Sequence, residues 1–174
     1  MTGMRVHRRN VLLALLCLAL LPAPGLAQAD APVVILSGAA LARAVPPGFY
    51  FEGQSAPTQM RNSAAARFGP GRHVVAGLVD TSGYSVEVRA KYEGFLITDD
   101  AVRVEGQELQ TGAYGFGFTD DGKFNVFDVG GRQVLSVAAT ADRTLRRPRP
   151  LLMQKQGREV RLYSGRQFVT IGAR

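Results

Sequence analysis

The residues best suited to bind a ligand lie in a short basic segment, residues 143–150 (RTLRRPRP). Proline lacks a backbone N–H and has a fixed φ, so Pro148 and Pro150 favour an extended connector here rather than a helix. The segment displays four guanidinium groups, on Arg143, Arg146, Arg147 and Arg149. Guanidinium forks fit phosphate and carboxylate groups, so the expected partner is an anionic cell-envelope polymer or a lipid headgroup. A solvated linker that pairs with Asp142 or with turn aspartates has the same composition, and this interpretation stays open.

The sequence offers few groups for nucleophilic or acid–base catalysis. One histidine, His73, follows the leader described below, and no cysteine does. His73 begins an apolar segment beside Val74 and Val75, which indicates a histidine at the end of a sheet that a neighbour satisfies. A hydrolase based on carboxylates needs two acids that converge across a cleft, and the spacing of the fourteen acidic residues singles out no pair. We therefore expect no enzyme and assign no catalytic residue, with a carboxylate-based hydrolase kept as an alternative.

Metal and cofactor sites are not expected either. Zinc sites take three or four well-placed ligands, and His73 with scattered carboxylates does not supply them. Two aspartate pairs, Asp99-Asp100 and Asp120-Asp121, have the oxygen atoms that calcium prefers. Both pairs fall in predicted turns, where aspartate commonly bonds the local backbone. No residue is therefore assigned to a metal or to a cofactor.

The fourteen aromatic residues allow two interpretations. They can fill an ordinary core, or they can line a barrel that carries a small apolar ligand. At residues 114–118 the aromatic side chains alternate with glycine, in the order Tyr-Gly-Phe-Gly-Phe. No helix start follows Gly115 and Gly117, so they are not a phosphate loop, and they indicate a bend or the close approach of another backbone. The aromatic face opposite these glycines is expected in the core.

Alternating and apolar segments predict many short strands. The expected strands cover residues 31–36, 48–52, 63–68, 72–79, 95–98, 102–104, 114–118, 123–129, 133–138, 151–155, 158–163 and 167–171. Turn residues join most of them into hairpins, and a hairpin across Gly69-Pro70-Gly71 is preferred there over a helical turn. A short helix is expected at 38–45, between Ser37 and Pro46-Pro47. The fold class is therefore mainly β: one domain of short antiparallel strands in a barrel or a sandwich, with one or two short helices.

Two segments are harder to assign. Residues 54–61 are polar and are expected to form a turn around Pro57. Residues 84–92 alternate apolar and polar side chains as a half-buried strand does, and this is the interpretation that we favour. The same segment also fits a helix, because Tyr84, Val88 and Tyr92 lie at helical spacing.

The first 29 residues predict export. A basic start precedes an apolar run at residues 11–21, and Ala27 and Ala29 are the small residues that a signal peptidase needs. Eleven apolar residues at about 1.5 Å each cannot cross a hydrocarbon core of about 30 Å, which favours a cleaved leader over a membrane anchor. The Arg8-Arg9 pair occurs in leaders for folded proteins, whereas the leucine-rich core fits the route for unfolded chains, so the export route stays open.

Cleavage after Ala29 leaves a domain at residues 30–174 that has no cysteine, because the single cysteine, Cys17, lies in the leader. Disulfides and thiolate metal sites are therefore excluded from it. Its net charge falls from +7 to +4, because three of the 21 basic residues leave with the leader and all 14 acidic residues remain. A small positive charge on an exported chain argues against nucleic acid as the partner. We expect an exported, periplasmic or extracellular, non-catalytic β domain with no transmembrane span after cleavage, whose oligomeric state stays open.

Overall fold

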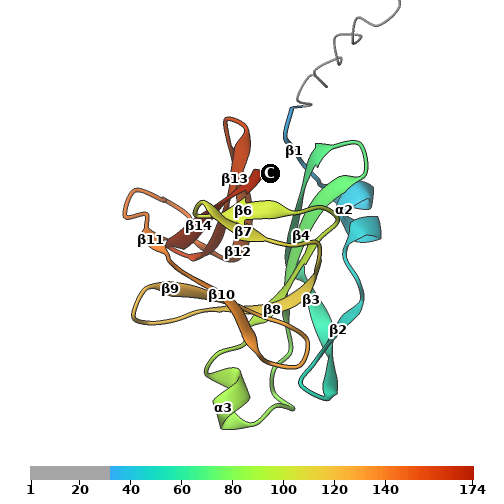
Figure 1. Cartoon of the computed structure of the whole chain (residues 1–174), viewed down its shortest axis with the longest axis vertical. Coiled ribbons are helices and arrows are strands. Elements are labelled where there is room, and N and C mark those ends of the chain that lie inside the picture. Colours follow the sequence, from blue (N-terminus) through green and yellow to red (C-terminus); the bar gives the residue numbers. More distant parts are fainter. Residues whose placement is uncertain (1–31) are drawn as a thin grey trace, which may run out of the picture. The chain divides into compact units, whose positions relative to one another are not determined.

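The computed structural model describes residues 32–174, and the expected leader with its cleavage positions, Ala27 and Ala29, lies outside the described residues. The described chain is mainly β, with two antiparallel sheets and two short helices (Figure 1). These strands form no closed barrel, and their arrangement is that of a β-sandwich. Of the two architectures that the sequence left open, the sandwich is therefore the one adopted.

The larger sheet contains eight strands. Its order is β1 (Val34–Ile35), β3 (Gln54–Gly69), β4 (Arg72–Val79), β5 (Gly94–Thr98), β8 (Gly112–Phe118), β9 (Lys123–Phe127) and β10 (Gln133–Ala138), with β2 (Gly48–Phe51) paired to β3. Two helices belong to the connections of this sheet: α2 (Gly38–Ala44) precedes β2 and α3 (Val86–Arg89) lies between β4 and β5.

The smaller sheet contains six strands and holds the connector predicted to bind anions. Its order is β12 (Arg149–Gln156), β13 (Glu159–Gly165), β14 (Gln167–Ala173), β6 (Val102–Val104) and β7 (Gln107–Leu109), with β11 (Thr140–Ala141) paired to β14. The chain crosses to this sheet after β5, returns for β8 to β10, and crosses again through β11. The arginine-rich segment follows this last crossing, in the connection from β11 to the start of β12 within the smaller sheet.

The main core lies between the two sheets. One contiguous cluster of buried apolar residues draws from both, with Leu96 and Phe116 of the larger sheet and Leu162 and Ile171 of the smaller one each fully buried. These positions alternate with residues on the opposite faces, as the two-residue period of a strand requires. The aromatic face of β8 that we expected in the core therefore lies there.

A second apolar cluster covers the other face of the larger sheet. Phe51 stacks on Tyr92 with ring centroids 4.1 Å apart, and both side chains are buried. A Cβ atom on Gly115 would lie 2.5 Å from the Phe51 ring, and one on Gly117 would collide with the carbonyl oxygen of Lys91. The two glycines of β8 thus permit the close approach of neighbouring segments, as the sequence indicated.

The expected turn at residues 54–61 is wrong, because β3 runs without a break from Gln54 to Gly69. Pro57 fits this strand because no ladder bond is needed from its nitrogen, while its carbonyl accepts the N–H of Asp80 at 3.0 Å. The strand also changes register between Thr58 and Ser63, which accommodates the polar stretch. The hairpin of β3 and β4 confirms the pairing expected across Gly69-Pro70-Gly71.

The strand favoured for residues 84–92 is also wrong, because the segment contains α3. Ser85 caps this helix by accepting the N–H of Val88 at 3.4 Å. Tyr84, Val88 and Tyr92, four residues apart, then pack on the second cluster. The segment forms a helix and not a strand because a helix places both tyrosines against one apolar surface.

Candidate functional site

Three of the four arginines of the candidate anion site lie on the connection from β11 to β12, which Figure 1 shows as an orange loop that projects from the side of the molecule, and the fourth, Arg149, is the first residue of β12. We call residues 142–150 the arginine connector. The four side chains are exposed, and they belong to Arg143, Arg146, Arg147 and Arg149. Within residues 32–174, no ion pair joins any of them to a carboxylate. Their positive charge is therefore available to a ligand.

Asp142 holds the start of the arginine connector. Its Oδ1 accepts hydrogen bonds from the Thr144 N–H at 2.9 Å, the Thr144 hydroxyl at 2.6 Å and the Leu145 N–H at 3.1 Å. Its Oδ2 accepts the Tyr163 hydroxyl at 3.1 Å. The Thr144 hydroxyl, with these other donors, holds the pKa of the Asp142 carboxyl below its ordinary value. The pairing of arginines with Asp142, which the sequence left open, is not made, because this carboxylate binds the backbone and a tyrosine.

Arg166 holds the arginine connector from the β13–β14 turn. Its guanidinium Nη1 donates to the carbonyl oxygens of Leu145 at 2.6 Å and of Arg143 at 3.4 Å. Tyr163 is 1% exposed although it alternates with Leu162, which faces the main core. Its ring packs on Phe168 with the ring centroids 5.1 Å apart. This packing fixes the position of the hydroxyl that donates to Asp142. The loop is thus attached to the smaller sheet by its backbone and by Asp142.

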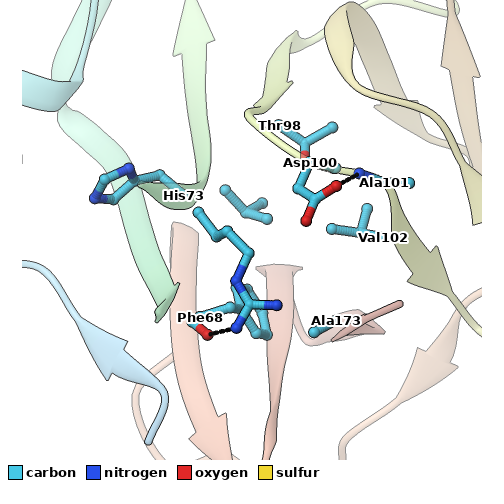
Figure 2. Close-up of a pocket in the computed structure, with 9 residues that line it drawn as sticks. Phe68, His73, Thr98, Asp100, Ala101, Val102 and Ala173 are labelled. Atoms are coloured by element: carbon cyan, nitrogen blue, oxygen red, sulfur yellow. Dashed lines mark hydrogen bonds between the residues drawn. The ribbon is translucent and has the colours of Figure 1, made fainter. Parts of the chain in front are cut away.

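His73 forms a local pair and lines a very small pocket. Its Nδ1 lies 2.9 Å from Asp99 Oδ2, which satisfies the ring from a neighbouring turn as the sequence indicated. The adjacent pocket has a volume of about 10 Å³, and Figure 2 shows the His73 ring pointing away from the Asp100 carboxylate across it. The Thr98 hydroxyl there donates to the Asp100 carbonyl, at 2.5 Å. The hydroxyl that lines the pocket is therefore bonded to the backbone, and the imidazole is bonded to Asp99.

A polar groove of about 290 Å³ lies on the smaller sheet, and the sequence analysis missed it. Arg103, Glu105 and Glu159 line it, and its floor includes Thr170 and Gly172. Gly172 pairs with Arg103 on one side and with Glu159 on the other, so the open floor separates a guanidinium from a carboxylate. The one feature of the sequence that indicated this region was the turn pair Glu105-Gly106 after β6. The groove brings two carboxylates to one concave surface, which is one of the conditions that a carboxylate-based hydrolase must meet.

Glu105 has a structural task within this groove. Glu105 and Gly106 have φ values of 47° and 80°, which fit the tight hairpin turn between β6 and β7. Oε1 of Glu105 accepts the N–H of Thr170 at 2.5 Å, so its carboxylate also fastens the turn to β14.

Glu93 is the acid with the most unusual environment. It lies between α3 and β5, and one of its carboxyl oxygens, Oε2, is buried without a hydrogen-bond partner among the described residues. Burial raises the pKa of Glu93, and the charge of Asp120 acts in the same direction, against the Phe118 N–H and the Ser164 hydroxyl. Neither described pocket is lined by Glu93, so its raised pKa does not coincide with a space for substrate.

The aspartates of the acidic turns bond to their neighbours, and the aromatic residues pack on one another. In the described part of the chain, no three His, Cys, Asp or Glu side chains gather as metal ligands do. Asp121 pairs with Lys123 at 3.0 Å, and Asp100 accepts the Ala101 N–H at 2.8 Å. The aromatic rings contact one another, as Phe116 and Phe124 do at 5.6 Å. The apolar residues thus fill the two clusters.

The comparisons with known proteins leave the site to be interpreted from its own residues. No protein-family model, curated protein or solved structure matches this chain. Across residues 32–174, every helix is too short or too polar to cross a membrane.

Proposed function

We propose that this chain is an exported, non-catalytic β-sandwich domain that binds an anionic component of the cell envelope, either a polymer or a lipid headgroup. The ligand would bind to Arg143, Arg146, Arg147 and Arg149 of the arginine connector. The leader pattern at residues 1–29 supports export, and the guanidinium groups support an anionic partner.

The observation that carries the proposal is that no carboxylate of residues 32–174 neutralises the positive charge of the arginine connector. Four exposed guanidinium groups lie within seven consecutive residues, and no carboxylate of residues 32–174 forms an ion pair with them. The nearest acid, Asp142, accepts its hydrogen bonds from Thr144, Leu145 and Tyr163 instead. Charge of one sign that the fold does not compensate attracts anions and raises their local concentration.

The experiment replaces Arg146, Arg147 and Arg149 by glutamine and measures retention on immobilised anionic polymer and on anionic vesicles. At about 1 kcal/mol for each basic group near an anionic surface, the loss of three groups should lower the affinity roughly 100-fold. The control replaces Arg43, Arg61 and Arg89, which are exposed on other elements, and so removes the same charge. If both triple variants bind as the wild type does, or lose affinity equally, the connector is not the site.

A carboxylate-based hydrolase is the second candidate, and the groove with Glu105 and Glu159 is the observation that favours it. Replacing both glutamates by glutamine should abolish release of reducing ends from envelope polysaccharide if the groove is catalytic. Wild-type protein that releases none removes this candidate.

A further inference from the structure

The arginine connector is ordered by contacts that use none of its four free guanidinium groups. Asp142 accepts two backbone N–H groups and the Tyr163 hydroxyl, and Arg166 donates to two backbone carbonyls. A flexible loop loses conformational freedom when it binds, which weakens the complex. The arginine connector loses this conformational freedom when the chain folds, so the loss does not weaken binding.

The arginine connector also lacks an apolar anchor. The large apolar side chains that are exposed in the described residues all precede residue 140: Val34, Tyr50, Met60, Val86, Val129 and Val134. The chain contains no tryptophan, one of the two aromatic residues that are enriched at membrane interfaces, and the one exposed tyrosine of the described residues, Tyr50, lies outside the connector. Stable attachment to a bilayer needs apolar insertion or a lipid chain in addition to charge. This surface therefore fits a hydrophilic chain better than a bilayer.

The basic groups of the connector are all arginine, and this favours phosphate. A carboxylate is planar, and one guanidinium fork can occupy both of its oxygens, whereas the oxygens of a phosphate are arranged tetrahedrally and can accept forks from more than one direction. Arg146, Arg147 and Arg149 lie close enough in sequence to contact neighbouring phosphates.

Resting on the proposed function, we infer that the arginine connector is a preformed site for a hydrophilic phosphate-bearing chain. Asp142 and Tyr163 are its positioning residues, because they hold the backbone that carries the arginines. They act through the loop and do not contact the ligand.

The test compares Asp142→Ala and Tyr163→Phe with the wild type in binding to long-chain inorganic polyphosphate. Asp142→Ala removes a negative charge beside the arginines, so attraction by charge alone predicts tighter binding. A preformed site predicts the opposite, with affinity about 5- to 10-fold weaker for Asp142→Ala and about 2- to 3-fold weaker for Tyr163→Phe. Glu87→Ala, on α3, is the matched control for the change in charge and should bind at least as tightly as the wild type.

The salt dependence separates positioning from a loss of contacts. The slope of log affinity against log salt reports the number of ionic contacts, and it should be the same for Tyr163→Phe and the wild type. Tyr163→Phe keeps the buried ring and the net charge, so it tests the inference even if Asp142→Ala unfolds.

Two results would overturn the inference while leaving the proposed function intact. One is loss of binding in the triple glutamine variant together with wild-type or tighter binding by Asp142→Ala and Tyr163→Phe. The other is binding to phosphatidylglycerol vesicles or to polyglutamate that equals binding to polyphosphate at the same charge concentration. Unchanged binding in the triple glutamine variant would instead remove the proposed function itself.

Discussion

The arginine connector and the polar groove both lie against the smaller sheet, and their ionic groups differ in what they contact. In the connector the backbone is bound by Asp142 and Arg166, while four guanidinium groups stay exposed. In the groove a guanidinium and two carboxylates face the same space, and Glu105 is itself bonded to the backbone of β14. The connector therefore has an excess of one charge, and the groove does not.

Elsewhere in the described chain, too, many acids accept hydrogen bonds from the backbone. Backbone N–H groups donate to carboxylates of Asp80, Asp99, Asp100, Asp128, Asp142 and Glu105. At Asp80, Asp100, Asp128 and Asp142 such bonds define turns, since a short carboxylate reaches the N–H groups that follow it. Asp99 and Glu105 instead join their turns to distant strands, because they accept from His73 and Thr170. The acids thus shape the loops that join the strands, and the connector displays its arginines on one such loop.

The largest expected effect is the response of connector binding to salt. Each ionic contact releases counterions, so four contacts predict that the affinity for polyphosphate falls roughly 1,000-fold between about 50 and 500 mM NaCl. A Glu105→Gln, Glu159→Gln double variant should follow the same salt dependence, because the groove is a separate site. An affinity that changes less than about tenfold would contradict an ionic interface.

The next effect is a pair of opposite pH dependences. Burial raises the pKa of Glu93, so the stability that it contributes is greatest below the unfolded value and is lost as the pH rises through the folded value. Glu93→Gln should therefore melt a few degrees above the wild type at pH 8 and at the same temperature at pH 4. Equal melting temperatures at both pH values would show that this buried carboxyl carries no penalty.

Asp142 should titrate in the other direction. Hydrogen bonds from Thr144 lower its pKa, so its contribution to stability is present above the ordinary value of 3.8 and is lost as the pH falls through the folded value. Asp142→Asn should melt below the wild type at pH 7, and the difference should shrink towards pH 2, as scanning calorimetry would detect. A difference that grows on acidification would contradict the assigned role of this carboxylate.

The smallest expected effect concerns the groove alone. Arg103→Gln removes one exposed charge outside the connector, so it should change polyphosphate affinity by less than about twofold. Isothermal titration calorimetry resolves this difference. A loss as large as that of the connector variants would make the two regions one continuous site.

The sequence predicted most strands because buried and exposed residues alternate in them. The strands after residue 94 are all present, with β7 and β11 as short additions. The turn predicted at residues 54–61 was wrong, because these residues form a strand through pairing with β2 and β4, whose residues lie elsewhere in the chain. The strand predicted at residues 84–92 was wrong, because the same pattern of tyrosines and valines fits both a strand and a helix. Only the packing of Tyr84 and Tyr92 decides between the two.

The candidate site was visible in part. Composition alone marked the four arginines of the connector. Its anchoring was not predictable, because Asp142 and Tyr163 lie 21 residues apart and meet only when β13 is placed beside the connection that follows β11. The groove was missed for a similar reason, since Arg103, Gly172 and Glu159 become neighbours through the pairing of β6, β14 and β13.

The most direct measurement is a titration of the labelled protein with polyphosphate, followed through the NMR signals of its amides and arginine side chains. The account predicts that the guanidinium signals of residues 143–149 shift strongly, that the backbone amides of Thr144 and Leu145 shift little, and that Arg103 does not respond. Shifts spread over basic residues of both sheets, or no shift in the connector, would contradict it.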